Sequence, residues 1–289
     1  MERTWTKKVS KYDILKKLIK YKKLWYNHVT YLWGEPFIQP VFMDALKLWK
    51  KLGFTILVTT NATTLNFEKQ AEKFLPYIDQ LILSVEAIDQ ELQQAISRTK
   101  VFVEWDKVFE NIEKHWRGNM LKANIVITQD NLPELFNIVK FLDEKWCKEV
   151  AITYPDVDIE YYSREHVLEK ITPTYSECME QIIPIVELCE VQNIRLKLPD
   201  FPFCVFPEEG REKYIPLTDD FDYANRVKAA DVIMADNKVY LWEVDREEVS
   251  PREREHVSNC EWCKYKQMCW WPSNKYEGLY GLDEINSIR

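Results

Sequence analysis

Residues 29–36 read VTYLWGEP, a short run of β-branched and aromatic side chains that ends in the turn Gly34-Glu35-Pro36. A run of this kind is typical of a buried strand, and glycine and proline mark its end. A helical pattern follows from about Pro40 and stops at Gly53, because glycine commonly ends helices. The stretch therefore predicts one unit of strand, polar turn and helix.

The same alternation of strand and helix returns further along the chain. We expect strands at residues 55–58, 80–85, 123–127, 150–153 and 194–198. We expect helices at residues 10–27, 67–74 and 175–191, a helical stretch that reaches about residue 116, and a helix that begins at residue 131. Strands that alternate with helices predict a parallel sheet with right-handed crossovers. About five such units indicate an α/β fold with a partial or complete parallel (β/α) barrel. An open doubly wound sheet is the alternative.

The composition changes near Pro199, where proline, acidic and aromatic residues replace the helical pattern until about Asp222. We expect a barrel domain over residues 1–199 and a small cysteine-rich extension over residues 200–289. Within the extension, residues 232–235 and 238–241 flank Asp236-Asn237, a connection suited to a β-hairpin. The remaining tail is too short to fold alone, so a bound metal is expected to stabilise it.

The balance of acidic and basic residues excludes some classes of binding partner. The 47 acidic and 39 basic side chains give a net charge of -8, which argues against a general nucleic-acid or membrane surface. We find no apolar run near ~18 residues and no signal-peptide pattern, so a cytoplasmic location is expected. Seven cysteines in a cytoplasmic chain are more readily metal ligands or buried thiols than a disulfide framework.

Every expected strand ends in polar residues. The ends are Gly34-Glu35-Pro36, Thr59-Thr60-Asn61, Ser84-Val85-Glu86, Thr128 and Thr153-Tyr154-Pro155. Ligands of parallel α/β folds bind at the carboxyl ends of the strands, which favours a ligand site here. The alternative for single residues such as Asn61 or Thr128 is that each one caps the following helix.

Four of these segments, VTYLWGEP, LVTTNATTL, ILSVEA and VITQDNLPEL, resemble in order and spacing the strand ends of radical S-adenosylmethionine (SAM) enzymes. The resemblance extends from about Thr30 to Pro155 and includes the C-terminal cysteines. It implies that SAM binds at the barrel mouth. Trp33 departs from the glycine usual in the family, and Glu86 stands where the family often has aspartate. The residues that the resemblance assigns to SAM are Gly34, Glu35, Pro36, Asn61, Ser84 and Arg98.

One family motif is absent from these residues. The family holds its radical-generating [4Fe-4S] cluster with a C-x3-C-x2-C loop, whereas residues 1–146 contain no cysteine. Residues 10–27 resemble the helix that follows this loop, so we expect the first barrel strand and the motif only in a longer chain. True loss of the motif is the alternative, and an unpaired edge on the next strand argues against it. The chain as given is expected not to cleave SAM reductively.

The C-terminal spacing Cys260-x2-Cys263-x5-Cys269 is the strongest metal-binding signal. Cys204 is the expected fourth ligand, and His256 is the alternative. The arrangement resembles the auxiliary-cluster region, called Twitch or SPASM, of many radical SAM enzymes. Four thiolates suit an iron-sulfur cluster or, alternatively, zinc. The other three cysteines have no short pairing and are expected to be buried structural thiols: Cys147, Cys178 and Cys189.

The resemblance thus implies an enzyme of oxidoreductase or maturase type, or a piece of one, that abstracts hydrogen from its substrate. Its partners would be a small-molecule or peptide substrate and an electron donor, with no nucleic acid and no membrane. The alternative is a non-catalytic metal-binding protein derived from a radical SAM barrel. The sequence identifies neither the substrate nor a residue that acts in the reaction.

Overall fold

The structure is a computed structural model, and it describes residues 16, 19–20, 22–23, 27–32, 34–97, 102–155, 170–218, 229–235, 238–243, 258–266, 269, 274–286 and 288. The chain divides into two compact units, each assembled from segments that lie far apart in the sequence. Unit 1 consists of residues 1–83, 103–121 and 224–249, and unit 2 consists of residues 84–102, 122–223 and 250–289. Residues 199 and 200, where the sequence suggests a boundary, both lie in unit 2.

Unit 1 contains a mainly parallel sheet in which the strands have the order β3-β2-β1-β7-β8. The strands are β1 (His28–Leu32), β2 (Thr55–Thr60), β3 (Gln80–Ser84), β7 (Ala229–Ala235) and β8 (Lys238–Glu243). β1 pairs in parallel with β2 and places Tyr31 beside Val58. β2 pairs in parallel with β3. The first three strands form where the sequence predicts them, because their aliphatic and β-branched side chains suit a buried sheet.

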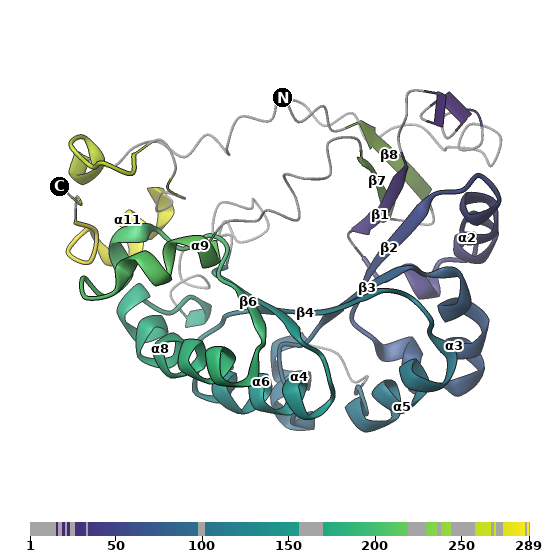
Figure 1. Cartoon of the computed structure of the whole chain (residues 1–289), viewed down its shortest axis with the longest axis horizontal. Coiled ribbons are helices and arrows are strands. Elements are labelled where there is room, and N and C mark those ends of the chain that lie inside the picture. The colour runs from purple at the N-terminus through teal and green to yellow at the C-terminus, as the bar shows by residue number, and fades with distance from the viewer. Residues whose placement is uncertain are drawn as a thin grey trace. The chain divides into compact units, whose positions relative to one another are not determined.

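The C-terminal hairpin is confirmed, and its position in the sheet is a finding. β7 and β8 pair antiparallel, and β7 also pairs in parallel with β1, which places Tyr31 beside Val232. Figure 1 shows β7 next to β1 in this unit. The expectation of an unpaired edge on β1 is therefore wrong, because β7 occupies that edge. The connection at residues 236–237 lies outside the described residues.

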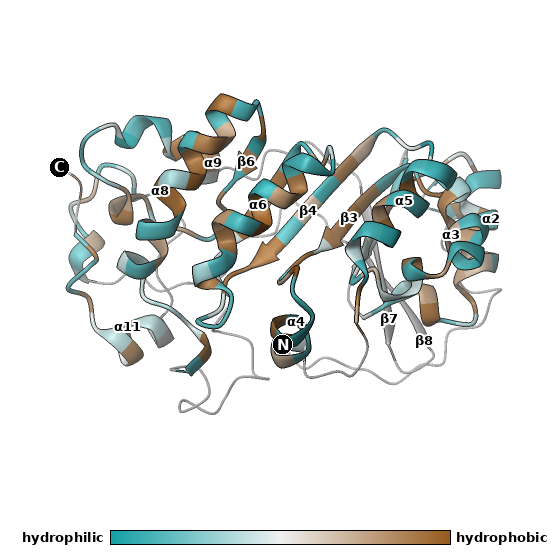
Figure 2. Ribbon diagram, turned by 90° about the horizontal axis from the view of Figure 1, so that it is seen from below, coloured by the Kyte–Doolittle hydropathy of each residue, from teal (hydrophilic) through white to brown (hydrophobic). Residues whose placement is uncertain are grey.

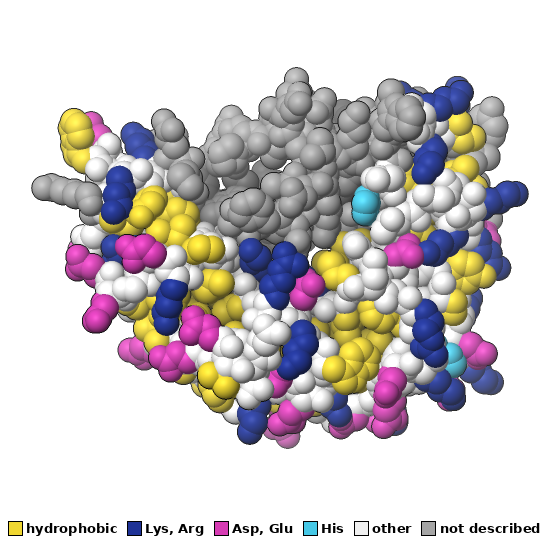
Figure 3. Space-filling model, viewed as in Figure 1, with side chains coloured by type: hydrophobic (Ala, Val, Ile, Leu, Met, Phe, Trp, Pro, Cys, Tyr) yellow, Lys and Arg dark blue, Asp and Glu magenta, His cyan; other side chains and the backbone are white. Residues whose placement is uncertain are grey.

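Unit 1 also contains three helices whose full length is described, together with an aromatic core. The helices are α2 (Phe42–Lys51), α3 (Glu68–Phe74) and α5 (Trp105–His115), and short 3-10 turns η1 (Pro36–Ile38), η2 (Thr63–Asn66) and η3 (Leu75–Tyr77) connect them to the strands. Tyr31 packs against Phe42 and Trp49 with ring centroids 4.7 and 4.4 Å apart. All three side chains are at most 1% exposed. In Figure 3 the outer side of the helices carries lysine, arginine and acidic side chains mixed together, as a solvated face does.

Unit 2 contains three further parallel strands, β4 (Met120–Val126), β5 (Glu149–Thr153) and β6 (Arg195–Lys197), in the order β4-β5-β6. Its helices are α4 (Gln90–Ser97), α6 (Leu135–Glu144), α8 (Tyr175–Gln192), α9 (Ile215–Thr218) and α11 (Asn274–Tyr280). Short 3-10 turns lie at η4 (Leu132–Glu134), η6 (Phe203–Val205), η7 (Arg211–Lys213) and η8 (Ser258–Cys260). Figure 2 shows α6 with hydrophobic and hydrophilic stripes, which is typical of a helix that covers a sheet.

Several expected helices differ from the observed ones. The helical stretch expected to reach residue 116 consists of two helices, α4 and α5, and residues 98–101 between them lie outside the described residues. The segment before Asp222 was expected to lack helix, yet it contains α9, whose first turn accommodates Pro216. Of the expected helix over residues 10–27, the described residues between 16 and 23 are helical.

The C-terminal segment docks on the first turn of α8. Glu284 accepts hydrogen bonds from the backbone N–H groups of Tyr175 at 3.2 Å and Ser176 at 3.1 Å. The hydroxyl of Tyr276 donates to the same carboxylate, and Tyr280 donates to the carbonyl of Thr172 at 2.6 Å. A carboxylate at a helix N-terminus satisfies otherwise unpaired donors and interacts favourably with the helix dipole. Residues far apart in the sequence thus form one compact unit.

Within each unit, the described strands do not close into a complete barrel. The fold is therefore α/β, with parallel strands of partial-barrel type, as the sequence predicts. None of the described helices combines the length and the apolar character that crossing a membrane requires.

Candidate functional site

The residues after β1 and β2 form one hydrogen-bonded cluster in unit 1. Thr60 Oγ1 lies 2.9 Å from both carboxylate oxygens of Glu35, and the backbone N–H of Asn61 donates to Glu35 at 2.9 Å. The backbone N–H of Phe37 donates to the same carboxylate at 3.2 Å. Glu35 thus joins its own turn to the end of the neighbouring strand.

Burial raises the pKa of the Glu35 carboxyl, and the hydrogen bonds from Asn61, Thr60 and Phe37 oppose this shift. A carboxylate has about four lone-pair sites, and these donors occupy most of them. The first role of Glu35 is therefore to hold the loop in place. Gly34 precedes it with φ of 70°, in the left-handed region that favours glycine.

Asn61 follows β2 with an exposed side chain. Its Oδ1 accepts from the backbone N–H of Thr63 at 3.1 Å and from the Thr63 hydroxyl at 2.8 Å. Its Nδ2 amide makes no hydrogen bond to another described residue, which leaves a donor available at the carboxyl end of the strands. Asn61 therefore caps the next turn and also presents one polar group to solvent.

The expected residues after β3 belong to unit 2. Ser84 is the last residue of β3, and its side chain is partly exposed. Glu86 follows two residues later, and burial of its carboxyl raises its pKa from 4.5 to about 7, opposed by a hydrogen bond from its own backbone. The structure therefore brings Gly34, Glu35, Pro36 and Asn61 together in unit 1 and Ser84 into unit 2. Arg98 and Trp33 lie outside the described residues.

Asn131 is a structural residue whose role the sequence did not reveal. Its Nδ2 donates to the carbonyls of Glu86 at 3.0 Å and Val126 at 2.9 Å, and its Oδ1 accepts from the backbone N–H of Thr128 at 2.7 Å. It is fully buried. Asn131 was expected to open a helix by capping it, but its side chain instead links the ends of two strands. The available signal was an amide side chain in the loop that follows β4.

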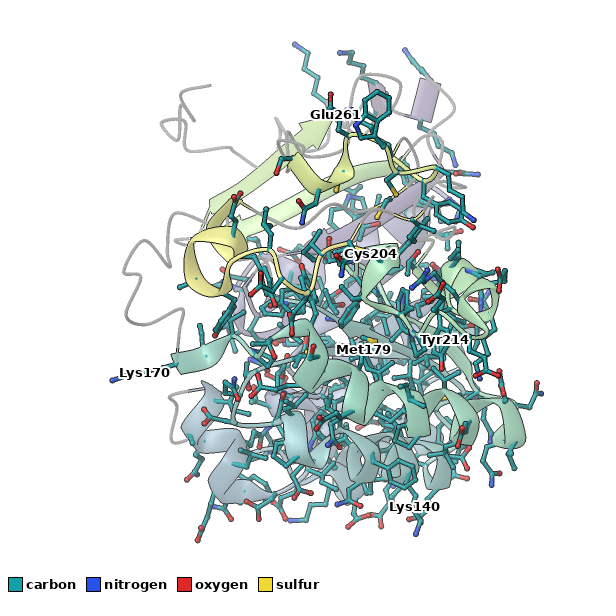
Figure 4. The ribbon with its side chains drawn as sticks, turned by 90° about the vertical axis from the view of Figure 1, so that its left-hand side faces the viewer. Lys140, Lys170, Met179, Cys204, Tyr214 and Glu261 are labelled. Carbon is teal, nitrogen blue, oxygen red and sulfur yellow. The ribbon has the colours of Figure 1, made fainter. Side chains whose placement is uncertain are left out.

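Four C-terminal cysteines lie in unit 2 and are electrostatic neighbours. The thiol of Cys204 interacts with those of Cys260 and Cys263, and the thiol of Cys269 interacts with all three. The backbone N–H of Phe203 donates to Cys269 Sγ at 3.2 Å. Figure 4 shows Cys204 next to the C-terminal segment that carries Glu261. The four thiols thus influence one another electrostatically, but among the described residues no three Cys, His, Asp or Glu side chains form a group that could hold a metal ion.

Burial raises the pKa of Cys204 to about 11 and of Cys269 to about 12. These thiols are therefore neutral at pH 7 without a metal. Amide hydrogen bonds to cysteine sulfur, such as the one that Phe203 donates, are typical of iron-sulfur ligands. Tyr265 packs against Phe203 with ring centroids 5.4 Å apart, whereas the nearby Trp262 side chain is 77% exposed.

The other three cysteines are at most 3% exposed: Cys147, Cys178 and Cys189. Burial raises the pKa of each thiol, to about 12 for Cys147 and for Cys189. Thiols of this kind act as small apolar side chains, as the sequence suggests. His256, the alternative fourth ligand, lies outside the described residues.

A family model described as the radical SAM superfamily matches residues 2–142. A SAM-dependent nucleotide dehydratase from Flammeovirga pacifica is 27% identical over 134 residues, which cover 45% of this chain and 45% of that protein. The chain thus spans about half the length of this curated relative. The similarity to the dehydratase concerns these 134 residues.

Among solved structures, SuiB of Streptococcus suis bound to SAM covers 81% of this chain and 53% of its own, at 18% identity and a TM-score of 0.50. The same enzyme bound to its precursor peptide SuiA covers 80% of this chain and 52% of its own, at 16% identity and a TM-score of 0.49. At this identity the likeness concerns the fold alone. It confirms a partial radical SAM barrel rather than a doubly wound sheet.

Proposed function

We propose that this chain, whose residues 2–142 match the radical SAM family model, binds SAM and a substrate as part of a radical SAM enzyme. The observation that carries the proposal is the Glu35 cluster, which fixes the polar ends of β1 and β2 at the same edge of unit 1. A preorganised loop loses little freedom when a ligand binds. The cofactor SAM would supply the reactive group, while the protein orients it.

The residues proposed to contact SAM have separate tasks. The turn at Gly34 allows a ligand to approach the backbone closely because glycine lacks a Cβ atom. The free Nδ2 of Asn61 can donate to an acceptor of SAM, and Pro36 fixes the turn. The resemblance also assigns Ser84 and Arg98 to SAM, and both assignments stay predictions.

The radical-generating cluster does not fit the residues of this chain. Residues 1–146 supply no cysteine, and no other side chain replaces a thiolate triad. We therefore derive no radical step from these residues. The substrate class is also a proposal. A nucleotide is the class named for the Flammeovirga pacifica relative, whereas a peptide is the class that the sequence analysis suggests.

Titration of the 289-residue chain with SAM in a calorimeter tests the proposal. We expect SAM to bind and Asn61→Ala to weaken binding about tenfold, because one hydrogen bond to a charged ligand is lost. Asn137→Ala is the matched control, since Asn137 is exposed on α6 and should not affect SAM. No heat of binding at millimolar SAM from a folded chain, or equal losses in both variants, would contradict the proposal.

A second proposal concerns the four C-terminal cysteines. We propose that Cys204, Cys260, Cys263 and Cys269 hold one auxiliary iron-sulfur cluster, with zinc as the alternative, because their spacing suits metal binding, their thiols interact electrostatically and one accepts an amide hydrogen bond. A bound cluster would carry an electron or bind substrate. If SAM does not bind, this site favours the alternative function of a non-catalytic metal-binding protein.

Metal analysis of anaerobically purified protein tests the cysteine site. We expect one metal centre per chain in the wild type and its loss in Cys260→Ala with Cys263→Ala. Cys189→Ala is the control, because this thiol is buried in α8. Iron and visible absorption would support the cluster, zinc would support the alternative, and retention of the metal in the double variant would contradict both.

A further inference from the structure

Four tyrosines of unit 2 pack against one another in a continuous row. The ring centroids of Tyr154 and Tyr175 lie 4.4 Å apart, and those of Tyr175 and Tyr276 lie 4.3 Å apart. Tyr280 continues the row, with its centroid 5.2 Å from that of Tyr276. Tyr154 directly follows β5 and Tyr280 ends α11, and Figure 1 shows α11 beside α8 in this unit. The row therefore connects the carboxyl end of a strand with the C-terminal segment.

The row has a buried part and an end near solvent. Tyr154, Tyr175 and Tyr276 are at most 3% exposed, whereas Tyr280 is partly exposed. Aromatic rings at these separations are in direct contact. An electron can therefore pass along the row in short steps from ring to ring.

The hydroxyls at the two ends of the row donate to backbone carbonyls, Tyr154 at 2.8 Å and Tyr280 at 2.6 Å. Tyr276 instead donates to the carboxylate of Glu284. A carboxylate can take up a proton and become a carboxylic acid, whereas a peptide carbonyl is far too weak a base to do so. The hydroxyl of Tyr276 thus lies against a base.

Both members of this pair are held at the first turn of α8. The Tyr276 oxygen accepts a hydrogen bond from the backbone N–H of Tyr175 at 3.1 Å, and Glu284 accepts from the N–H groups of Tyr175 and Ser176. Burial and the hydrogen bond to Glu284 raise the pKa of Tyr276, so the phenol keeps its proton at pH 7. Proton transfer needs a donor and an acceptor within hydrogen-bond distance, and this pair meets that condition.

We propose that Tyr276 is a redox-active tyrosine, whose electron passes through Tyr175 and Tyr154 to a one-electron oxidant at the carboxyl end of β5. An oxidised tyrosine is a strong acid, so its radical persists where a base accepts the phenolic proton, as Glu284 does here. The O–H bond of Tyr276 breaks and an O–H bond forms on Glu284. The oxidant gains one electron, and Tyr276 becomes a neutral phenoxyl radical. An electron donor that reaches Tyr280 reverses the step.

Such a row draws oxidation away from the polar strand ends, where a stray radical would attack the protein itself. The inference rests on the proposed function only in naming the oxidant in the cell. This would be a carbon-centred radical, which takes up the electron and a proton from water to form a C–H bond. The oxidation of Tyr276 itself needs neither SAM nor a metal.

Photochemical oxidation of the full chain without SAM tests the inference. A ruthenium tris-bipyridine complex with persulfate supplies the one-electron oxidant, and electron paramagnetic resonance of rapidly frozen samples detects the trapped radical. We expect a neutral tyrosyl radical, which ring-deuterated tyrosine identifies by narrowing its spectrum. Tyr276→Phe keeps the packed ring and should lower the radical yield about tenfold or more, because a positioned proton acceptor then has no phenol to serve.

Tyr214→Phe is the matched control. Tyr214, labelled in Figure 4, is 2% exposed in the same unit and stacks on Phe206 with ring centroids 5.1 Å apart, outside the row. Its substitution should leave the radical yield unchanged. Equal yields in the wild type and Tyr276→Phe, or no trapped tyrosyl radical in the folded wild type, would overturn the inference.

The proton acceptor gives a second test. In the wild type, exchange into D2O should reveal one deuteron that the new carboxylic acid of Glu284 donates to the phenoxyl oxygen. Glu284→Gln should remove this coupling and lower the yield, whereas Glu180→Gln, exposed on α8, should change neither. Circular dichroism confirms that both variants are folded at the temperature used. An unchanged coupling in Glu284→Gln contradicts the role of Glu284 as the acceptor.

Cys178 is an oxidisable side chain beside the row, since its thiol interacts electrostatically with Tyr154 and Tyr276. A sulfur-centred signal that disappears in Cys178→Ala would assign the oxidation to this thiol and overturn the inference. Failure of SAM to bind, with the Tyr276 radical intact, would overturn the proposed function alone.

Discussion

The backbone N–H of Asn61 donates a 2.9 Å hydrogen bond to the carboxylate of Glu35, twenty-six residues earlier in the chain. This contact joins the polar ends of β1 and β2, which the sequence marks as two separate turns. Thr60 strengthens the link through its hydroxyl, and that hydroxyl in turn accepts from the backbone N–H of Ala62. The candidate SAM loop is therefore held by the protein itself.

We expect Glu35→Gln to destabilise the protein by about 2–3 kcal/mol, because the amide replaces one acceptor of a buried carboxylate with a donor that faces N–H groups. Urea unfolding at pH 7 measures this loss. Glu72→Gln is the control, since Glu72 is exposed on α3, and its effect should stay within about 0.5 kcal/mol. Equal stability of both variants would show that the Glu35 cluster does not hold the loop.

Stability should fall as the pH rises through the range in which Glu86 ionises. Burial raises the pKa of Glu86 from 4.5 to about 7, so the folded state favours the neutral carboxyl. The unfolded chain ionises near 4.5, and the penalty therefore grows between pH 4.5 and 7, up to about 3 kcal/mol. We expect Glu86→Gln to flatten urea stability over this range and to stabilise the protein at pH 8. A wild-type curve that the substitution leaves unchanged contradicts the assignment.

Tyr31→Phe should be neutral or slightly stabilising, by up to about 1 kcal/mol. The Tyr31 hydroxyl is buried and has no hydrogen-bond partner among the described residues, and the Trp49 indole N–H beside it has none either. Removing an unsatisfied buried hydroxyl relieves a desolvation cost without creating a large cavity. Thermal unfolding measures the change, and a loss above about 1 kcal/mol would mean that the hydroxyl has an ordered partner such as a buried water.

Glu284→Gln should loosen the docking of the C-terminal segment on α8. Glu284 accepts from Tyr175 and Ser176 at the start of that helix, so the substitution removes a charged cap worth about 1–2 kcal/mol. We expect faster limited proteolysis near the C-terminus and lower thermal stability. Glu180→Gln, exposed on the same helix, is the control and should leave both unchanged.

Reductive cleavage of SAM should not occur in the chain as given. Residues 1–146 contain no cysteine to hold the cluster that delivers the electron. Anaerobic reconstitution with iron, sulfide, dithionite and SAM should yield no 5′-deoxyadenosine above a protein-free blank. Multiple turnovers of 5′-deoxyadenosine would show that other ligands hold a competent cluster.

The sequence by itself determined the elements that depend on local patterns. Short runs of β-branched, aliphatic and aromatic side chains predicted the strands, and glycine and proline predicted their ends, because these preferences act within a few residues. The polar residues after each strand marked the candidate site, since parallel strands end at one edge. The spacing of Cys260, Cys263 and Cys269 marked a cluster of thiols for the same local reason.

Only the tertiary structure decided which distant groups meet. It placed β7 beside β1, turned Glu35 toward the backbone of Asn61, and packed Tyr276 against Tyr175. None of these contacts follows from neighbouring residues, because each depends on strand register and on the packing of segments that are far apart in the chain. Burial then set the chemistry, since removal from water rather than residue type raises the pKa of Glu86 to about 7.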